Sequence, residues 1–204
     1  RFRSSGISNL ANNPVETVEA ELGVEIMSYA LRPDSGGAGR WRGGCGMELT
    51  FRALTDDTNV LGRGMERLLF RPWGSNGGRP GAPGKLIVNR GRPDERRLGK
   101  IDVLTVNAGD TITFLTPGAG GWGDPAERDT AAVRHDVRNG FVTAEAAARD
   151  YGVVIHGGEV DEAGTRLRRA AMQPTGGDGP ERERWDAVFT PELMDRLNTG
   201  LVAL

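Results

Sequence analysis

Alternating apolar and polar residues predict several short β-strands in the first half of the chain. In residues 47–54, "MELTFRAL", an apolar side chain falls at every second position, as in a strand with one buried face. Alternation also predicts a strand at residues 24–32, and further strands are expected at 65–70, 85–89, 100–106 and 110–115, where turn signals separate short apolar segments. Short strands separated by turn residues, with little helix between them, indicate an antiparallel sheet or sandwich.

The pattern changes to that of helices after Asp124. Asp129 and Thr143 are predicted N-caps of two helices, which Gly140 and Gly152 would end. Three more helices are expected: one at the segment "PVETVEAEL", one at "VDEAGTRLRRAAM", which Gly164 weakens, and one at the chain's last fifteen residues. The predicted fold class is therefore α+β: a mainly antiparallel, sandwich-like β domain, then a small helical module. The expected boundaries are 1–123 for the β domain, 124–172 for the helical module, and 173–204 for a linker and terminal helix.

Composition adds one unusual feature, which is glycine. The chain has 31 glycines in 204 residues, about twice the usual fraction of roughly 7%. They cluster at residues 36–46, 74–84 and 118–123 without a collagen period, which indicates loops whose backbone adopts geometries that other residues avoid. The first cluster is expected to reverse the chain between two strands, and the third to form a tight turn.

Charge and cysteine content limit the class of protein. A net charge of −2 predicts no nucleic-acid partner, and no apolar run reaches the roughly 18 residues of a membrane-spanning helix. The single cysteine excludes an internal disulfide framework and favours a reducing, cytoplasmic location. The chain opens at Arg1 without a methionine, so we expect a piece of a longer protein.

Motifs for catalysis or cofactor binding fail when their spacing is tested. The nearest match to a phosphate-binding loop has Arg79 and Leu86 at positions that the motif reserves for other residues. Residues 118–123, "GAGGWG", match G-x-G-x-x-G, but the strands before them do not predict the parallel sheet that dinucleotide binding requires. His135 and His156 lack partners at metal-ligand spacing. We therefore expect no catalytic, cofactor-binding or metal-binding residue in this chain.

Arginine and tryptophan on the glycine-rich loops leave two interpretations open. These side chains could face a partner protein or an anionic ligand, or they could stack and form hydrogen bonds within the chain. The candidate interface or substrate-facing residues are Arg40, Trp41, Arg42, Arg71, Trp73, Gly77, Gly78, Arg79 and Trp122.

Five unusual motifs, read in order, resemble the C-terminal portion of the hydantoinase B/oxoprolinase family. They are "GISNLANNPVE", "YALRPDSGGAGRWRGGCG", "RPWGSNGGRPGAPG", "GDTITFLTPGAGGWGDP" and "EAAARDYGVV", and the resemblance covers about residues 5–170. It implies a large protein that works with a hydantoinase A-type partner and opens cyclic amides with ATP and a divalent metal. Related complexes carboxylate ketones. The family's metal ligands belong to an N-terminal part that these residues do not match.

The resemblance implies a structural and assembly part of a B-type subunit of an ATP-dependent cyclic-amide hydrolase. The expected partners are the N-terminal part of the same subunit and an A-type subunit, in a hetero-oligomer without nucleic acid or membrane. The chain alone is expected to be inactive. Two alternatives stay open: the same part of an ATP-dependent ketone carboxylase, and a non-catalytic module whose glycine loops hold a small anion.

Overall fold

A computed structural model describes residues 13–62, 67–99, 101–172, 187–188, 190–193 and 196. Its contacts divide the chain into two compact units. Unit 1 comprises Arg1–Ala30, Glu48–Met65 and Lys85–Leu115, and unit 2 comprises Leu31–Met47, Glu66–Gly84 and Thr116–Leu204. Both units are built from segments that lie far apart in sequence. The boundaries expected at residues 123 and 172 stay a prediction, because compactness alone does not test independent folding.

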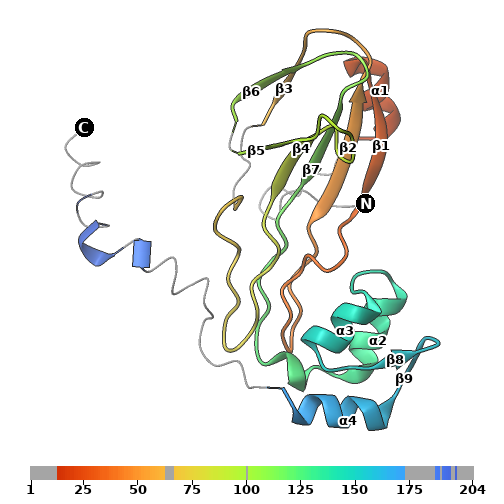
Figure 1. Cartoon of the computed structure of the whole chain (residues 1–204), viewed down its shortest axis with the longest axis vertical. Helices are drawn as coiled ribbons and strands as arrows, with labels where there is room; N and C mark the ends of the chain where they lie inside the picture. Colours follow the sequence, from red (N-terminus) through yellow and green to blue (C-terminus); the bar gives the residue numbers. More distant parts are fainter. Residues whose placement is uncertain are drawn as a thin grey trace. The chain divides into compact units, whose positions relative to one another are not determined.

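Unit 1 contains a five-stranded sheet in the order β1-β2-β7-β4-β5 (Figure 1). The strands are β1 (Val24–Leu31), β2 (Met47–Ala53), β4 (Lys85–Val88), β5 (Arg96–Leu98) and β7 (Thr111–Leu115). The pairs β2–β7, β4–β7 and β4–β5 are antiparallel. Two further strands, β3 (Thr58–Leu61) and β6 (Val103–Val106), form a separate antiparallel pair. The α+β prediction is confirmed, with a mainly antiparallel sheet and several helices.

Side chains fill the interior of unit 1. The buried cluster contains Leu86, Val106 and Ile112, with the stacked rings of Phe51 and Phe114 packed against it. Helix α1 (Val15–Leu22) precedes β1 and ends at Gly23, whose φ of 60° lies in the left-handed region. The predicted helix at this position is confirmed.

Three glycine-rich segments, residues 34–46, 71–84 and 116–123, form much of unit 2, and we call them the glycine segments. They run side by side and exchange backbone hydrogen bonds without forming a regular sheet. Arg79 N–H donates to Ala38 O (2.7 Å), Gly37 N–H to Ala119 O (2.8 Å) and Gly121 N–H to Arg79 O (2.9 Å). Each segment therefore bonds to both of the others, which satisfies the backbone polar groups that this interior buries.

Close approach of backbones, rather than unusual φ angles, explains most of these glycines; Gly77 and Gly123 are the ones whose φ lies in the left-handed region. A Cβ atom on Gly118 would overlap the carbonyl oxygen of Ser35, and one on Gly37 would overlap that of Arg79. No glycine of the first segment has φ in the left-handed region; the residue that does is Asp34, at 56°. The expected special glycine geometry in this segment was wrong, and so was the tight turn at 118–123. A side chain at these positions would hold the segments apart.

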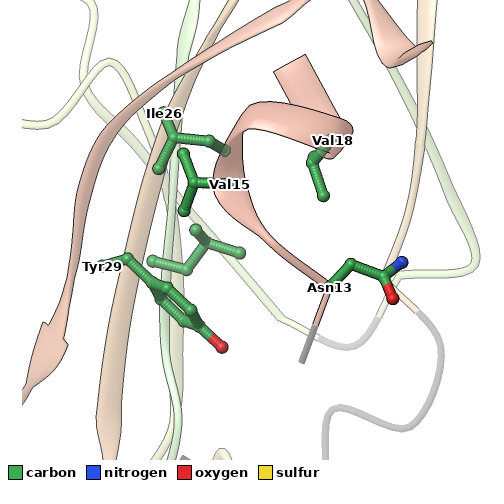
Figure 2. Close-up of a pocket in the computed structure, with 6 residues that line it drawn as sticks. Asn13, Val15, Val18, Ile26 and Tyr29 are labelled. Atoms are coloured by element: carbon green, nitrogen blue, oxygen red, sulfur yellow. The ribbon is translucent and has the colours of Figure 1, made fainter. Parts of the chain in front are cut away.

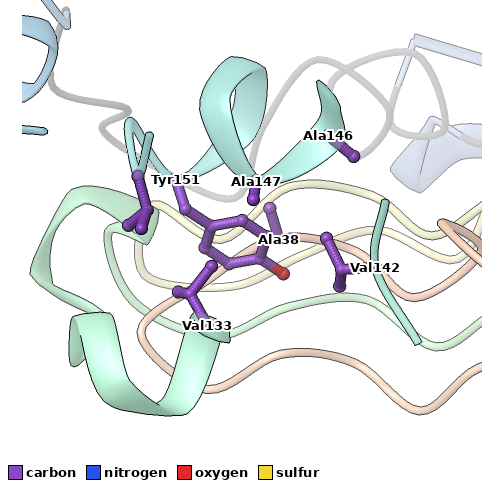
Figure 3. Close-up of a cluster of buried hydrophobic side chains, with 7 residues drawn as sticks. Ala38, Val133, Val142, Ala146, Ala147 and Tyr151 are labelled. Carbon is purple, nitrogen blue, oxygen red and sulfur yellow. The ribbon is translucent and has the colours of Figure 1, made fainter. Parts of the chain in front are cut away.

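The helical part of unit 2 follows the third glycine segment. It contains a 3₁₀ turn at Pro125–Glu127, α2 (Thr130–Arg138), α3 (Ala144–Asp150), a hairpin of β8 (Ile155–His156) and β9 (Glu159–Val160), and α4 (Glu162–Ala170). The predicted caps are confirmed, because the side chains of Asp129 and Thr143 accept hydrogen bonds from first-turn amides, and Asp124 caps the 3₁₀ turn in the same way. In Figure 3 the Tyr151 ring lies among Val133, Ala147 and Ala38, so a glycine segment contributes to this core.

Some predicted elements differ from the structure. The strand expected at residues 65–70 is absent over 67–70, where Arg67 has a φ of 58° that a strand does not accommodate. Residues 65 and 66 lie outside the described residues. Strands β3, β5, β8 and β9 were not predicted. Residues 187–188, 191–193 and 196 are helical, and nearly all the rest of the predicted linker and terminal helix at 173–204 lies outside the described residues.

Candidate functional site

Arg42 is bound inside unit 2. Its Nε donates to Asp136 Oδ2 (2.9 Å), its Nη1 donates to Gly43 O (2.8 Å), and its guanidinium lies 5.3 Å from the Phe141 ring centroid. Asp136, on α2, also accepts from Arg128 Nη2 at 2.9 Å. The side chains of Arg42 and Asp136 are only 15% and 6% exposed, so this is a buried ion pair. Arg42 thus ties the first glycine segment to α2.

The hydroxyl of Tyr151 lies beside this charged group and has no hydrogen-bond partner among the residues that the structure describes. The residue is 2% exposed, and Arg128 lies 6.0 Å from the ring centroid. Burial raises the pKa of this hydroxyl, while the positive charge of Arg128 opposes the rise. Tyr151 therefore stays protonated at neutral pH and acts here as a packing residue.

Trp41 and Trp122 differ from Arg42 because they face solvent. Their backbones form an antiparallel bridge in which each N–H donates to the other's carbonyl oxygen at 2.9 Å. Directly opposed residues of an antiparallel pair project to the same face. The tryptophans are 63% and 46% exposed. Arg40, also exposed, forms a 3.6 Å ion pair with Glu127.

The second glycine segment uses its candidate side chains mostly within unit 2. Arg71 donates from Nε to Gly81 O (2.9 Å) and from Nη2 to Pro80 O (3.3 Å). The Trp73 ring lies 4.8 Å from the guanidinium carbon of Arg67. Gly77, with a φ of 89°, and Gly78 are both buried, and a Cβ on Gly78 would overlap the carbonyl of Gly121.

A polar pocket of about 290 Å³ lies in unit 2, and we call it the arginine pocket. Arg79 Nη1 donates to Asp150 Oδ1 (3.0 Å), and Arg149 binds the same carboxylate through Nε and Nη2. These bonds to Asp150 raise the pKa of Arg149. The lining residues are Asp34, Gly36, Ala38, Arg71, Arg79, Pro80, Arg149 and Asp150.

An apolar pocket of about 220 Å³ lies in unit 1 (Figure 2). Val15 and Val18 of α1 line it together with Ile26 and Tyr29 of β1, Leu49 and Asn13. Figure 2 shows Val15, Ile26 and Tyr29 close together beside helix α1. Asn13 and Tyr29 are the polar lining residues, and neither supplies a charge or a metal ligand.

The described residues do not fit the metal that the resemblance implies for the whole complex. Within residues 13–62, 67–99 and 101–172, no group of three His, Cys, Asp or Glu side chains is placed to hold a metal ion. His135 and His156 are both exposed. In the part of the chain that the structure covers, no helix is long and apolar enough to cross a membrane.

Sequence reasoning missed the helical residues that meet the glycine segments. Asp136 accepts hydrogen bonds from both Arg42 and Arg128, while Asp150 and Arg149 complete the arginine pocket. One signal was available: Asp136 follows Val133 by three positions, so a charged residue falls on the apolar face of a helix. Such a position predicts a buried ionic partner, although not which arginine supplies it.

Comparisons with known proteins give relatives over most of the chain. The caprolactamase subunit beta of Pseudomonas jessenii is 38% identical over 171 residues, which is 79% of this chain and 29% of that protein. The acetone carboxylase alpha subunit of Xanthobacter autotrophicus is 28% identical over 184 residues, covering 70% of this chain and 23% of that one. The chain thus spans less than a third of the length of these relatives.

Solved structures show the same fold. The crystal structure of the ATP-dependent caprolactamase from Pseudomonas jessenii superposes with a TM-score of 0.61 and 34% identity, covering 78% of this chain and 28% of that one. A nucleotide-free acetone carboxylase structure superposes with a TM-score of 0.65 and 21% identity, covering 94% and 29%. Residues 3–125, more than half of the chain, match the family model described as hydantoinase B/oxoprolinase, and the chain therefore belongs to this family.

Proposed function

We propose that this chain is a structural and assembly part of the B-type subunit of an ATP-dependent cyclic-amide hydrolase. One observation supports the assembly role. Arg42 and Arg71 use their side chains for hydrogen bonds within unit 2, whereas the side chains of Trp41 and Trp122, also on the glycine segments, stay exposed. Tryptophan is the residue most enriched where protein interfaces bind tightly. A rigid backbone scaffold holds this pair in place without a partner.

The cyclic-amide substrate class is proposed from the relatives. The caprolactamase that resembles this chain in sequence and fold is an ATP-dependent enzyme, and its matching protein is a subunit. We assign ATP, the divalent metal and the ring-opening chemistry to other parts of such a complex, including a hydantoinase A-type subunit. A cytoplasmic location fits the single cysteine, Cys45, which is a free thiol.

The assembly role is tested by reconstitution with the upstream part of the B-type subunit and the A-type subunit. Replacing both Trp41 and Trp122 by serine should weaken assembly at least about tenfold, because such aromatic anchors contribute 2 kcal/mol or more to an interface. Leu167→Ser is the matched control, since Leu167 is 76% exposed on α4 of the same unit. Sedimentation measures the complex, and equal assembly by both variants would contradict the proposal.

The substrate class is tested in the same reconstituted complex. We expect ATP hydrolysis that depends on a cyclic amide such as caprolactam or 5-oxoproline, with release of the ring-opened amino acid. The second candidate, ketone carboxylation, is favoured by the similarity to the acetone carboxylase alpha subunit. It predicts ATP turnover that requires bicarbonate and a ketone, and that result would replace the hydrolase assignment.

A further inference from the structure

We propose that the arginine pocket binds a small carboxylate anion, a role that does not depend on the proposed function. Three guanidinium groups and two carboxylates line the pocket, those of Arg71, Arg79, Arg149, Asp34 and Asp150. Their charges sum to +1, so a ligand with one negative charge would neutralise the pocket. A pocket of about 290 Å³ is at the small end of the usual range for ligand sites, which indicates a small molecule.

The three arginines keep donors beyond those used within the protein. A guanidinium carries five N–H bonds. Arg79 uses Nη1 for Asp150, Arg71 uses Nε and Nη2 for backbone carbonyls, and Arg149 uses Nε and Nη2 for Asp150. The other guanidinium nitrogen atoms, Arg79 Nε and Nη2 among them, have no partner among the described residues. A planar carboxylate matches such paired donors better than a spherical ion does.

The internal bonds also hold the pocket in shape before a ligand arrives. Arg79 and Arg149 share the carboxylate of Asp150, while Arg71 is fixed by two carbonyls of its own glycine segment. Gly36 and Ala38 of the first glycine segment also line the pocket. Backbone hydrogen bonds from Gly37 to Ala119 and from Arg79 to Ala38 hold this part of the segment in place. Binding would therefore order few side chains, which lowers its entropic cost.

A substitution at Asp34 can distinguish an anion-binding pocket from one that only stabilises the fold. The two carboxylate oxygens of Asp34 accept from the backbone N–H (2.8 Å) and the hydroxyl (2.9 Å) of Thr143. Asparagine can replace these bonds, because its oxygen accepts from the amide and its NH₂ donates to the hydroxyl. Asparagine also tolerates the left-handed φ of 56° at this position. Asp34→Asn should therefore remove a repelling charge and keep the local structure.

The experiment titrates the 204-residue chain with sodium acetate and follows backbone amide signals of Gly36 and Arg79 by NMR. Sodium chloride at equal ionic strength is the reference. We expect a saturable shift with acetate that Arg79→Gln weakens about tenfold, the loss of a charge-assisted hydrogen bond. Asp34→Asn should tighten binding about threefold, because one like charge is removed. Arg40→Gln, an exposed arginine outside the pocket, should leave binding unchanged.

Several results would overturn the proposal. They are equal shifts with chloride and acetate, equal loss in Arg40→Gln and Arg79→Gln, unchanged or weaker binding in Asp34→Asn, and tighter binding of sodium phosphate than of acetate. Thermal unfolding checks that each variant is folded. If Arg79→Gln is not, Arg149→Gln replaces it, because that variant leaves the Arg79–Asp150 pair in place, and its retention of full affinity would equally count against the pocket.

Discussion

Unit 1 fills its interior with side chains, whereas the glycine segments of unit 2 fill theirs with backbone. In unit 1, Leu86 and Ile112 are almost completely buried and sit on paired strands. In unit 2, Gly37, Gly118 and Gly121 bring main chains so close that no methyl group fits between them. The two interiors should therefore be destabilised by opposite kinds of substitution. Unit 1 should lose stability when buried side-chain atoms are removed, and the glycine segments should lose stability when side-chain atoms are added.

The largest expected effect is that of Gly118→Ala. The new Cβ would overlap the Ser35 carbonyl oxygen, and the nearest atoms are all backbone, so no side chain can rotate away. We expect a loss of about 4 kcal/mol or more in the free energy of unfolding, at the upper end for single substitutions. Urea-induced unfolding followed by circular dichroism measures it.

Gly44→Ala is the matched control in the same unit. Nothing lies within 4 Å of a Cβ built on Gly44, and its φ is outside the left-handed region. This variant should change stability by less than about 0.5 kcal/mol. Similar losses of stability in Gly118→Ala and Gly44→Ala would show that these glycines are needed for their backbone conformation and not for close approach. That result would contradict the proposed difference between the two interiors.

The next effect is a deletion in unit 1. Leu86→Ala removes a side chain that is 1% exposed and leaves a cavity among packed neighbours. The expected loss is about 3 kcal/mol, from lost burial plus the cavity. Leu54→Ala, at a position that is 53% exposed, should lose less than about 0.5 kcal/mol. If Leu86→Ala were as mild as its control, side-chain packing would not be what holds unit 1 together.

Local sequence patterns predicted the elements of unit 1 better than the interior of unit 2. The strands β1, β2 and β7 follow from alternation over consecutive residues, β4 follows from a short apolar run, and the N-cap residues predict α2 and α3. The three clusters of glycine were visible too. Their mutual contact was not, because it joins residues such as Gly37 and Ala119, which are far apart in sequence and share no periodic signal.

In the candidate site, too, local features were predictable from the sequence and long-range contacts were not. Arg40, Arg42 and Trp41 are adjacent in sequence, yet one is buried in an ion pair and two face solvent. The sequence indicated that this Arg-Trp-Arg motif was unusual. It did not show which arginine would be buried, because the partner of Arg42 is Asp136, which lies 94 residues away. Tertiary contacts of this kind carry no local propensity and are read only from the folded chain.

A smaller effect is expected at Tyr151, in the side-chain core of unit 2. Tyr151→Phe keeps the buried ring and removes a hydroxyl for which the described part of the chain supplies no hydrogen-bond partner. Because burying an unpaired polar group is unfavourable, stability should be unchanged or rise by up to about 1 kcal/mol. Thermal unfolding with and without the hydroxyl measures this. A loss above about 1 kcal/mol would mean that the hydroxyl is hydrogen-bonded in solution.

The smallest effect should come from pH, through Asp110 in unit 1. Hydrogen bonds from the Asn107 backbone (2.9 Å) and the Asn89 side chain (2.8 Å) lower the pKa of this carboxyl in the folded chain. A lowered folded pKa means that the ionised form stabilises the fold above the unfolded pKa of about 3.9. That contribution is lost as the pH falls through the folded value. Asp110→Asn should therefore be less stable than the natural chain at about pH 7 and approach it at about pH 3. Urea midpoints at the two pH values measure the difference, and a gap that stays constant or widens in acid would rule out Asp110 as its source.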